Sequence, residues 1–140
     1  MKKIVLLSVI VALFAFKMLN EPWTKEQILQ PETLAATMQN AKAKQPIIIN
    51  IGPAGSIKTS VSFGSTQDKE SLDSLQHFLQ KIPKNTEVVL YCGCCPFEHC
   101  PNIRPAFTLI KQMKFTNPKL LNLSHNLKVD WIDKGFPMSE

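Results

Sequence analysis

Four cysteines, Cys92, Cys94, Cys95 and Cys100, lie within nine residues of one another. A cysteine thiolate is both a nucleophile and a soft metal ligand, so this cluster suits group transfer, thiol redox chemistry or metal binding. Arg104, the only arginine in the 140 residues, follows the cluster. A guanidinium beside a thiolate lowers the pKa of the thiol and binds oxyanions through paired hydrogen bonds. Together these residues indicate nucleophilic thiol chemistry on an anionic substrate.

The elements expected on either side of the cluster place Cys92 where reactive groups are usually found. Glu87 and the apolar run over 88–91 predict a buried strand, and Cys92 follows it directly. After the loop 92–101, Asn102 is expected to cap a helix that reaches Met113. In open α/β sheets, ligands bind beyond the carboxyl ends of the strands, and a helix N-terminus stabilises an anion. The pattern therefore predicts that Cys92 faces the start of this helix.

The remaining elements alternate between strands and helices, which predicts an α/β fold. A mostly parallel sheet of about five strands, with helices on both faces, is expected. Apolar or alternating runs predict strands at 28–29, 47–51, 57–63, 87–91 and 119–123. Helical spacing predicts helices at 31–40, from about 65 to 82, at 102–113 and at 127–133. Residues 28–140 are expected to form one domain, and residues 21–27 a linker.

The first twenty residues predict export. Lys2 and Lys3 precede an apolar run over 4–16, which is typical of a signal peptide. The residues around Ala15 form a weak cleavage site, so a membrane anchor over residues 4–19 and a buried helix remain as alternatives. The expected location is the periplasm, either free or anchored to the inner membrane.

Net charge argues against binding to nucleic acid. The formal net charge is +5, but residues 1–20 hold Lys2, Lys3 and Lys17 and no acidic residue. The rest has 13 basic and 11 acidic residues, a net charge of +2. No block of five or more consecutive basic residues occurs. We therefore expect no nucleic-acid partner.

Several segments together resemble the rhodanese-like domain family. The strand that ends in Tyr91-Cys92 resembles the strand that leads to the active-site cysteine of that family. Trp131 to Pro137 resembles the family's pattern of Trp, Gly and Pro near the end. Similar segments are also found at Gly55–Ile57 with Val61 and Phe63, and at Leu109–Phe115. The resemblance covers roughly residues 28–137 and implies a three-layer fold.

The resemblance implies a sulfurtransferase. Cys92 would be the nucleophile that takes a sulfane sulfur and carries it as a persulfide. Arg104 and the loop N–H groups would stabilise the anionic substrate. The partners implied are a small anionic sulfur donor and a thiol acceptor. We also expect no cofactor and a monomeric chain.

Two departures from the family motivate an alternative without sulfur transfer. The family's Asp-x-Arg after the first buried strand is replaced by Asn50-Ile51-Gly52, and eleven residues separate Cys92 from Arg104. The long loop would then bind a metal or act in thiol redox or partner binding, or Cys92 would be an inert buried thiol.

The other loop residues have several competing roles. Cys94, Cys95, His99 and Cys100 offer ligands suited to zinc or copper. Cys100 could instead form a disulfide with Cys92 or Cys95, whereas a bridge between the adjacent Cys94 and Cys95 would be strained. Glu98 would repel anions or keep the loop in water.

Overall fold

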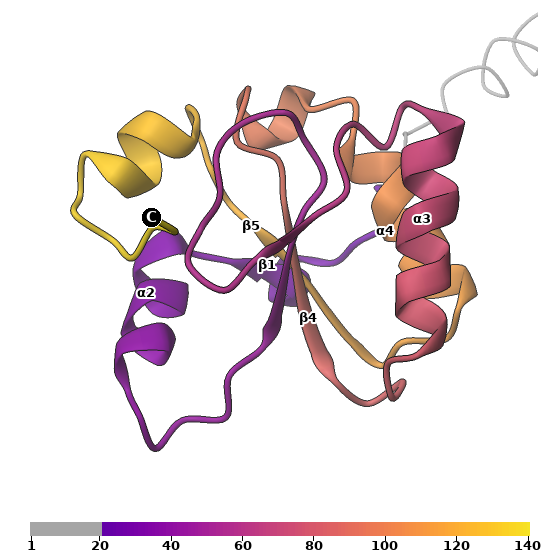
Figure 1. Ribbon diagram of the computed structural model, residues 1–140, viewed down its shortest axis with the longest axis horizontal. Helices are drawn as coiled ribbons and strands as arrows, with labels where there is room; N and C mark the ends of the chain where they lie inside the picture. The colour runs from indigo at the N-terminus through magenta and orange to yellow at the C-terminus, as the bar shows by residue number, and fades with distance from the viewer. Residues whose placement is uncertain (1–20) are drawn as a thin grey trace, which may run out of the picture.

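The computed structural model describes residues 21–140 and shows a five-stranded parallel sheet in the order β1-β5-β4-β2-β3 (Figure 1). The strands are β1 (Ile28–Leu29), β2 (Ile47–Asn50), β3 (Val61–Ser62), β4 (Glu87–Tyr91) and β5 (Asn117–Leu121). The helices are α2 (Pro31–Gln39), α3 (Lys69–Gln80) and α4 (Ile103–Gln112). Short turns η1 (Lys25–Gln27), η2 (Phe97–His99) and η3 (Lys128–Ile132) complete the structure.

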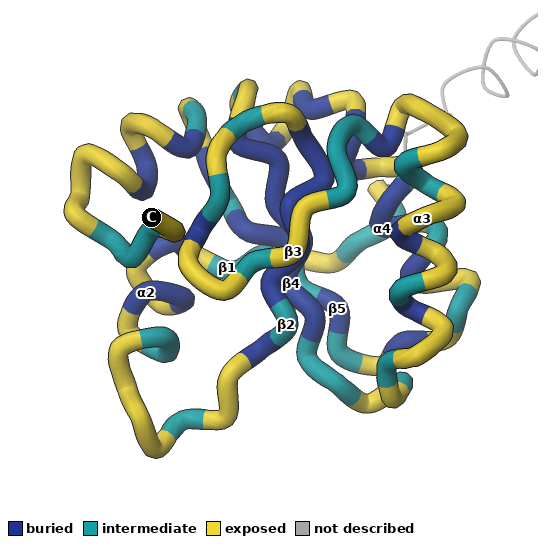
Figure 2. Tube along the Cα trace, in the orientation of Figure 1, coloured by how far each residue is buried: buried dark blue, intermediate teal, exposed yellow. Residues whose placement is uncertain are grey.

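The central strands are apolar because both faces of the sheet are covered. Strand β4 pairs with β2 on one side and with β5 on the other, and Asn50 lies opposite Tyr91. Residues Val88–Tyr91 are completely buried, and the buried centre of the sheet can be followed in Figure 2. The expected parallel sheet of about five strands, covered on both faces, is confirmed.

The helices form two layers, one on each face of the sheet (Figure 1). On one face, Leu75 and Leu79 of α3 pack with the apolar side of α4. On the other face, Leu34 of α2 packs with Trp131 of η3. These two apolar clusters lie on either side of the sheet, so the architecture is the three-layer α/β arrangement that the sequence predicts.

The strand predicted at 57–63 is wrong for most of its length. Only Val61 and Ser62 pair with β2, and Thr59 has a left-handed backbone with a φ of 65°. The turn at Thr59 breaks the segment in two. Ile57 is buried and forms an isolated antiparallel bridge with Met138. The alternation of apolar and polar residues therefore does not mark one strand face, because Ile57 is buried in the core whereas Val61 is exposed.

The segment expected to be a linker packs against the domain. Trp23 lies against Phe97 and Phe107, with ring centroids 5.5 and 5.8 Å away. Thr24 and Gln27 form a capping box, which closes the single turn η1. Within residues 21–140, no helix is long and apolar enough to cross a membrane. The predicted signal peptide or anchor lies outside the described residues, so export stays a prediction.

Candidate functional site

Cys92 lies directly beyond the carboxyl end of β4, the central strand, as the sequence predicts. Cys92 is 2% exposed. Gly52, just beyond the neighbouring strand β2, leaves space for the sulfur, because a Cβ on Gly52 would lie 2.4 Å from Cys92 Sγ. Asn50 accepts the Gly52 N–H at 3.0 Å, which fixes this turn against the thiol. The residues that replace the family's Asp-x-Arg therefore shape one wall of the thiol site.

Hydrogen bonds stabilise the thiolate form of Cys92 and lower its pKa to about 5. The largest contribution comes from the Cys100 thiol. Burial raises the pKa of Cys92, but hydrogen bonds from the Asn102 amide and from the N–H and thiol of Cys94 lower it. The Asn102 amide nitrogen lies 3.4 Å from Cys92 Sγ, and Cys94 Sγ lies at the same distance. Cys92 is therefore a thiolate at neutral pH, stabilised by uncharged donors.

Asn102 is oriented by the segment that leads into α3. Its side-chain oxygen accepts the Ser65 hydroxyl at 2.8 Å and the Gln67 N–H at 3.3 Å. Because both contacts require the amide oxygen, the amide nitrogen must point the other way, toward Cys92. Asn102 was expected to cap α4, but its side chain makes no capping hydrogen bond. The sequence shows only an asparagine at a helix start after a cysteine loop. That pattern fits a helix cap as well as a hydrogen-bond donor to the thiol.

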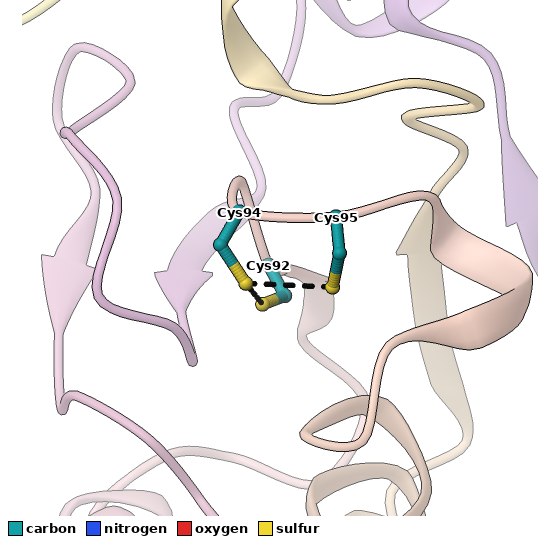
Figure 3. Close-up of side chains that lie close together, drawn as sticks. All are labelled: Cys92, Cys94 and Cys95. Atoms are coloured by element: carbon teal, nitrogen blue, oxygen red, sulfur yellow. Dashed lines mark hydrogen bonds between the residues drawn. The ribbon is translucent and has the colours of Figure 1, made fainter.

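The structure brings three sulfur atoms together (Figure 3). Those of Cys92, Cys94 and Cys95 lie within 4.8 Å of one another, and Cys94 Sγ is 3.4 Å from Cys95 Sγ. All four cysteines of the loop are free thiols in the structure. Burial raises the pKa of Cys94 to about 12, and hydrogen bonding to the Cys92 sulfur raises that of Cys100. The loop therefore places the acidic thiol of Cys92 beside the weakly acidic thiols of Cys94 and Cys100.

The residues close enough to share a metal ion differ from the set that the sequence suggested, Cys94, Cys95, His99 and Cys100. Cys94 and Cys95 group with Cys92, and His99 is not part of this cluster. His99 and Glu98 line a cleft of about 360 Å³ together with Pro96, Asn122 and Ser124.

Arg104 lies at the start of α4, but its guanidinium is directed elsewhere. It forms an ion pair with Glu21 and lies 5.4 Å from the centroid of the Trp23 ring. Nearly half of its side chain is exposed. The contacts to the Cys92 sulfur come instead from thiols and amides. A role for Arg104 at the thiolate stays a prediction.

A second polar cluster lacks the geometry of a catalytic triad. The Ser124 hydroxyl and the Asp130 carboxylate both contact the same ring nitrogen of His125, at 3.1 and 3.0 Å. A Ser-His-Asp triad needs the two ring nitrogens to make separate contacts. The buried Asp130 instead accepts the N–H groups of His125 and Asn126 and so fixes the turn before η3.

Comparisons with known proteins support the fold. No family model matches the chain, and no curated protein matches it. Among solved structures, a Lactobacillus plantarum protein is 16% identical with a TM-score of 0.61, covering 99% of this chain and 98% of its own. Wild-type EanB is 21% identical, with a TM-score of 0.57 over 81% of this chain.

An anaerobic ergothioneine biosynthesis enzyme from Chlorobium limicola, in complex with trimethyl histidine, is 21% identical with a TM-score of 0.56 over 81% of this chain. The chain spans only 27% of EanB and 28% of the C. limicola enzyme. At these identities the likeness concerns the fold, which agrees with the three-layer rhodanese-like arrangement that the sequence predicts.

Proposed function

We propose that the chain is a rhodanese-like sulfurtransferase that carries sulfane sulfur as a persulfide on Cys92. The observation that carries this proposal is the surroundings of Cys92 Sγ at the end of β4. A buried thiol that receives hydrogen bonds from two other thiols, an amide and a backbone N–H is a stable thiolate. A neighbour of the same fold, EanB, has been determined in a persulfide form with ergothioneine, and this supports sulfur chemistry on the fold.

The proposed reaction has two steps. The Cys92 thiolate attacks the outer sulfur of a donor such as thiosulfate, the donor's S–S bond breaks, and sulfite leaves with the electron pair. The Cys92 persulfide is then attacked at its outer sulfur by a thiol or by cyanide, and the Cys92 thiolate is released. The hydrogen-bond donors around Cys92 stabilise the thiolate at the start and end of the cycle, and the low pKa makes Cys92 a good leaving group.

The test measures thiocyanate formed from thiosulfate and cyanide by the full-length protein, and compares it with Cys92→Ser. Loss of product in Cys92→Ser is the expected result. Cys95→Ser is the matched control, because it removes a thiol from the same loop that is not in hydrogen-bond contact with Cys92 Sγ, and it should keep most of the activity. Undiminished activity in Cys92→Ser would refute the assignment.

The second candidate is a metal centre, favoured by the three clustered sulfurs of Cys92, Cys94 and Cys95. Zn–S bonds of about 2.3 Å place two thiolates of a tetrahedral site about 3.8 Å apart. The observed separations of 3.4 Å, and of no more than 4.8 Å, fit such a site after small shifts. The three thiolates would be the ligands, and zinc would act as a structural ion or Lewis acid.

The metal candidate is tested by adding zinc or copper(I) to protein purified under reducing conditions. Stoichiometric binding that disappears in Cys94→Ser would support it. A lack of stoichiometric metal, with unchanged folding in chelator, would remove it.

A further inference from the structure

The nucleophile and the surface of the protein are separated by a second thiol. Cys92 is 2% exposed, whereas Cys94 is exposed, and their sulfur atoms are 3.4 Å apart. Figure 3 shows the Cys94 sulfur in contact with both Cys92 and Cys95. A small anion needs little space to reach Cys92, but an acceptor thiol carried on a large molecule meets Cys94 first.

We propose that Cys94 is a sulfur relay, which takes the sulfane sulfur from Cys92 and presents it to the acceptor at the surface. This inference rests on the proposed sulfurtransferase function. It assigns the acceptor to a class, namely thiols on peptides or proteins, which the buried Cys92 does not reach directly.

The relay step balances without any oxidant or reductant. The proton of the Cys94 thiol passes to the outer sulfur of the Cys92 persulfide, and the Cys94 sulfur then attacks that outer sulfur. The S–S bond to Cys92 breaks, and its electron pair stays on Cys92 as the thiolate. The products are a Cys94 persulfide and the original Cys92 thiolate. The sulfane sulfur has moved from Cys92 to Cys94, and the total charge is unchanged.

The environment of the two thiols sets the direction of this step. The same hydrogen bonds that lower the pKa of Cys92 make it the better leaving group. Cys94, whose pKa is raised, is favoured as the carrier of the neutral persulfide. The competing attack on the inner sulfur would form a Cys92–Cys94 disulfide and release sulfide, which is a poorer leaving group than the Cys92 thiolate.

The test follows a single turnover after loading the full-length protein with thiosulfate and removing the excess. Alkylation and fragment-ion mass spectrometry then locate the extra sulfur, and transfer is timed separately to glutathione and to cyanide. Wild-type protein is expected to carry part of the sulfur on Cys94. In Cys94→Ser, all of it should stay on Cys92, and the rate of transfer to glutathione should fall about tenfold or more relative to the rate with cyanide.

Serine keeps a hydroxyl donor near Cys92, and Cys95→Ser is the matched control, expected to keep most of the transfer to glutathione. Equal rates of transfer to glutathione in wild type and Cys94→Ser would overturn the relay while leaving sulfur transfer through Cys92 intact. Release of free sulfide with formation of a Cys92–Cys94 disulfide would also overturn it. Failure of the wild type to load any sulfur would overturn the proposed function itself.

Discussion

Replacing Asn102 is expected to weaken the acidity of Cys92. Its amide nitrogen lies 3.4 Å from Cys92 Sγ, and the site is buried. A hydrogen bond to a charged group contributes about 1.5–3 kcal/mol, although a long contact to sulfur lies toward the lower end. Because 1.4 kcal/mol corresponds to a factor of ten, Asn102→Ala should reduce the acid dissociation constant of the Cys92 thiol by about 10- to 100-fold.

A nearly isosteric variant, Asn102→Asp, tests the same contact by replacing the amide donor with a negatively charged carboxylate. Asn102→Asp keeps the oxygen that accepts the Ser65 hydroxyl but places a carboxylate beside the thiolate. The acidity of Cys92 should fall further than in Asn102→Ala, because like charges raise the pKa of a thiol. The Thr66 hydroxyl donates to the backbone carbonyl of residue 102 at 2.6 Å, so the backbone contact survives both changes.

The assay is the pH dependence of Cys92 alkylation, followed by mass spectrometry so that the four thiols are distinguished. The midpoint should move to higher pH in both variants. Ser65→Ala, which leaves the Asn102 amide nitrogen in place, should move it much less. The same midpoint in wild type and Asn102→Ala would refute the reasoning, because it would mean that the other donors alone stabilise the thiolate.

Three further predictions follow from the same contacts. The alkylation rate of wild-type Cys92 should rise as the pH rises through about 5 and then level off, because deprotonation is complete there; a rate that still climbs above neutral pH would contradict the lowered pKa. Gly52→Ala should lower the free energy of unfolding by about 1–3 kcal/mol in urea, because its Cβ would overlap the Cys92 sulfur. Gly55→Ala is the control, since its Cβ would meet neighbours only at ordinary contact distance, and equal losses in the two variants would count against the packing argument. Tyr91→Phe should also cost about 1–3 kcal/mol, because the Tyr91 hydroxyl accepts the buried Ile57 N–H at 2.9 Å, and an unchanged urea midpoint would show that water replaces it.

The central part of the fold could be predicted from the sequence because its signals are local. The apolar runs at 47–49 and 88–91 lie in segments bounded by turn-forming residues, and runs of this kind have few other stable arrangements. The position of Cys92 at the end of a strand follows from the second run. Pro31 at the first position of α2 and Gly135 with a φ of 70° also appear where their backbone preferences place them.

The contacts around the thiol could not be predicted, because they depend on the direction of side chains. Asn102 is able to cap its helix or to turn toward a neighbouring loop, and only the packing of residues 65–67 decides between the two. Arg104 has a long side chain that reaches Glu21, more than eighty positions earlier in the chain. Residue type and spacing carry no record of such distant partners.

The hydrogen bonds of the cysteine loop determine when, during folding, the four thiols take their final places. Phe97 donates its N–H to the carbonyl of Leu123, and Leu127 donates to that of Gly93. Ile28 at the other end of the domain pairs with Leu120. Contacts so distant in sequence form late, because closing a long loop of chain is entropically unfavourable. Until residues 120–127 are in place, these two contacts do not hold the loop, so oxidation of a partly folded chain would favour disulfides among its four cysteines that the folded structure does not contain.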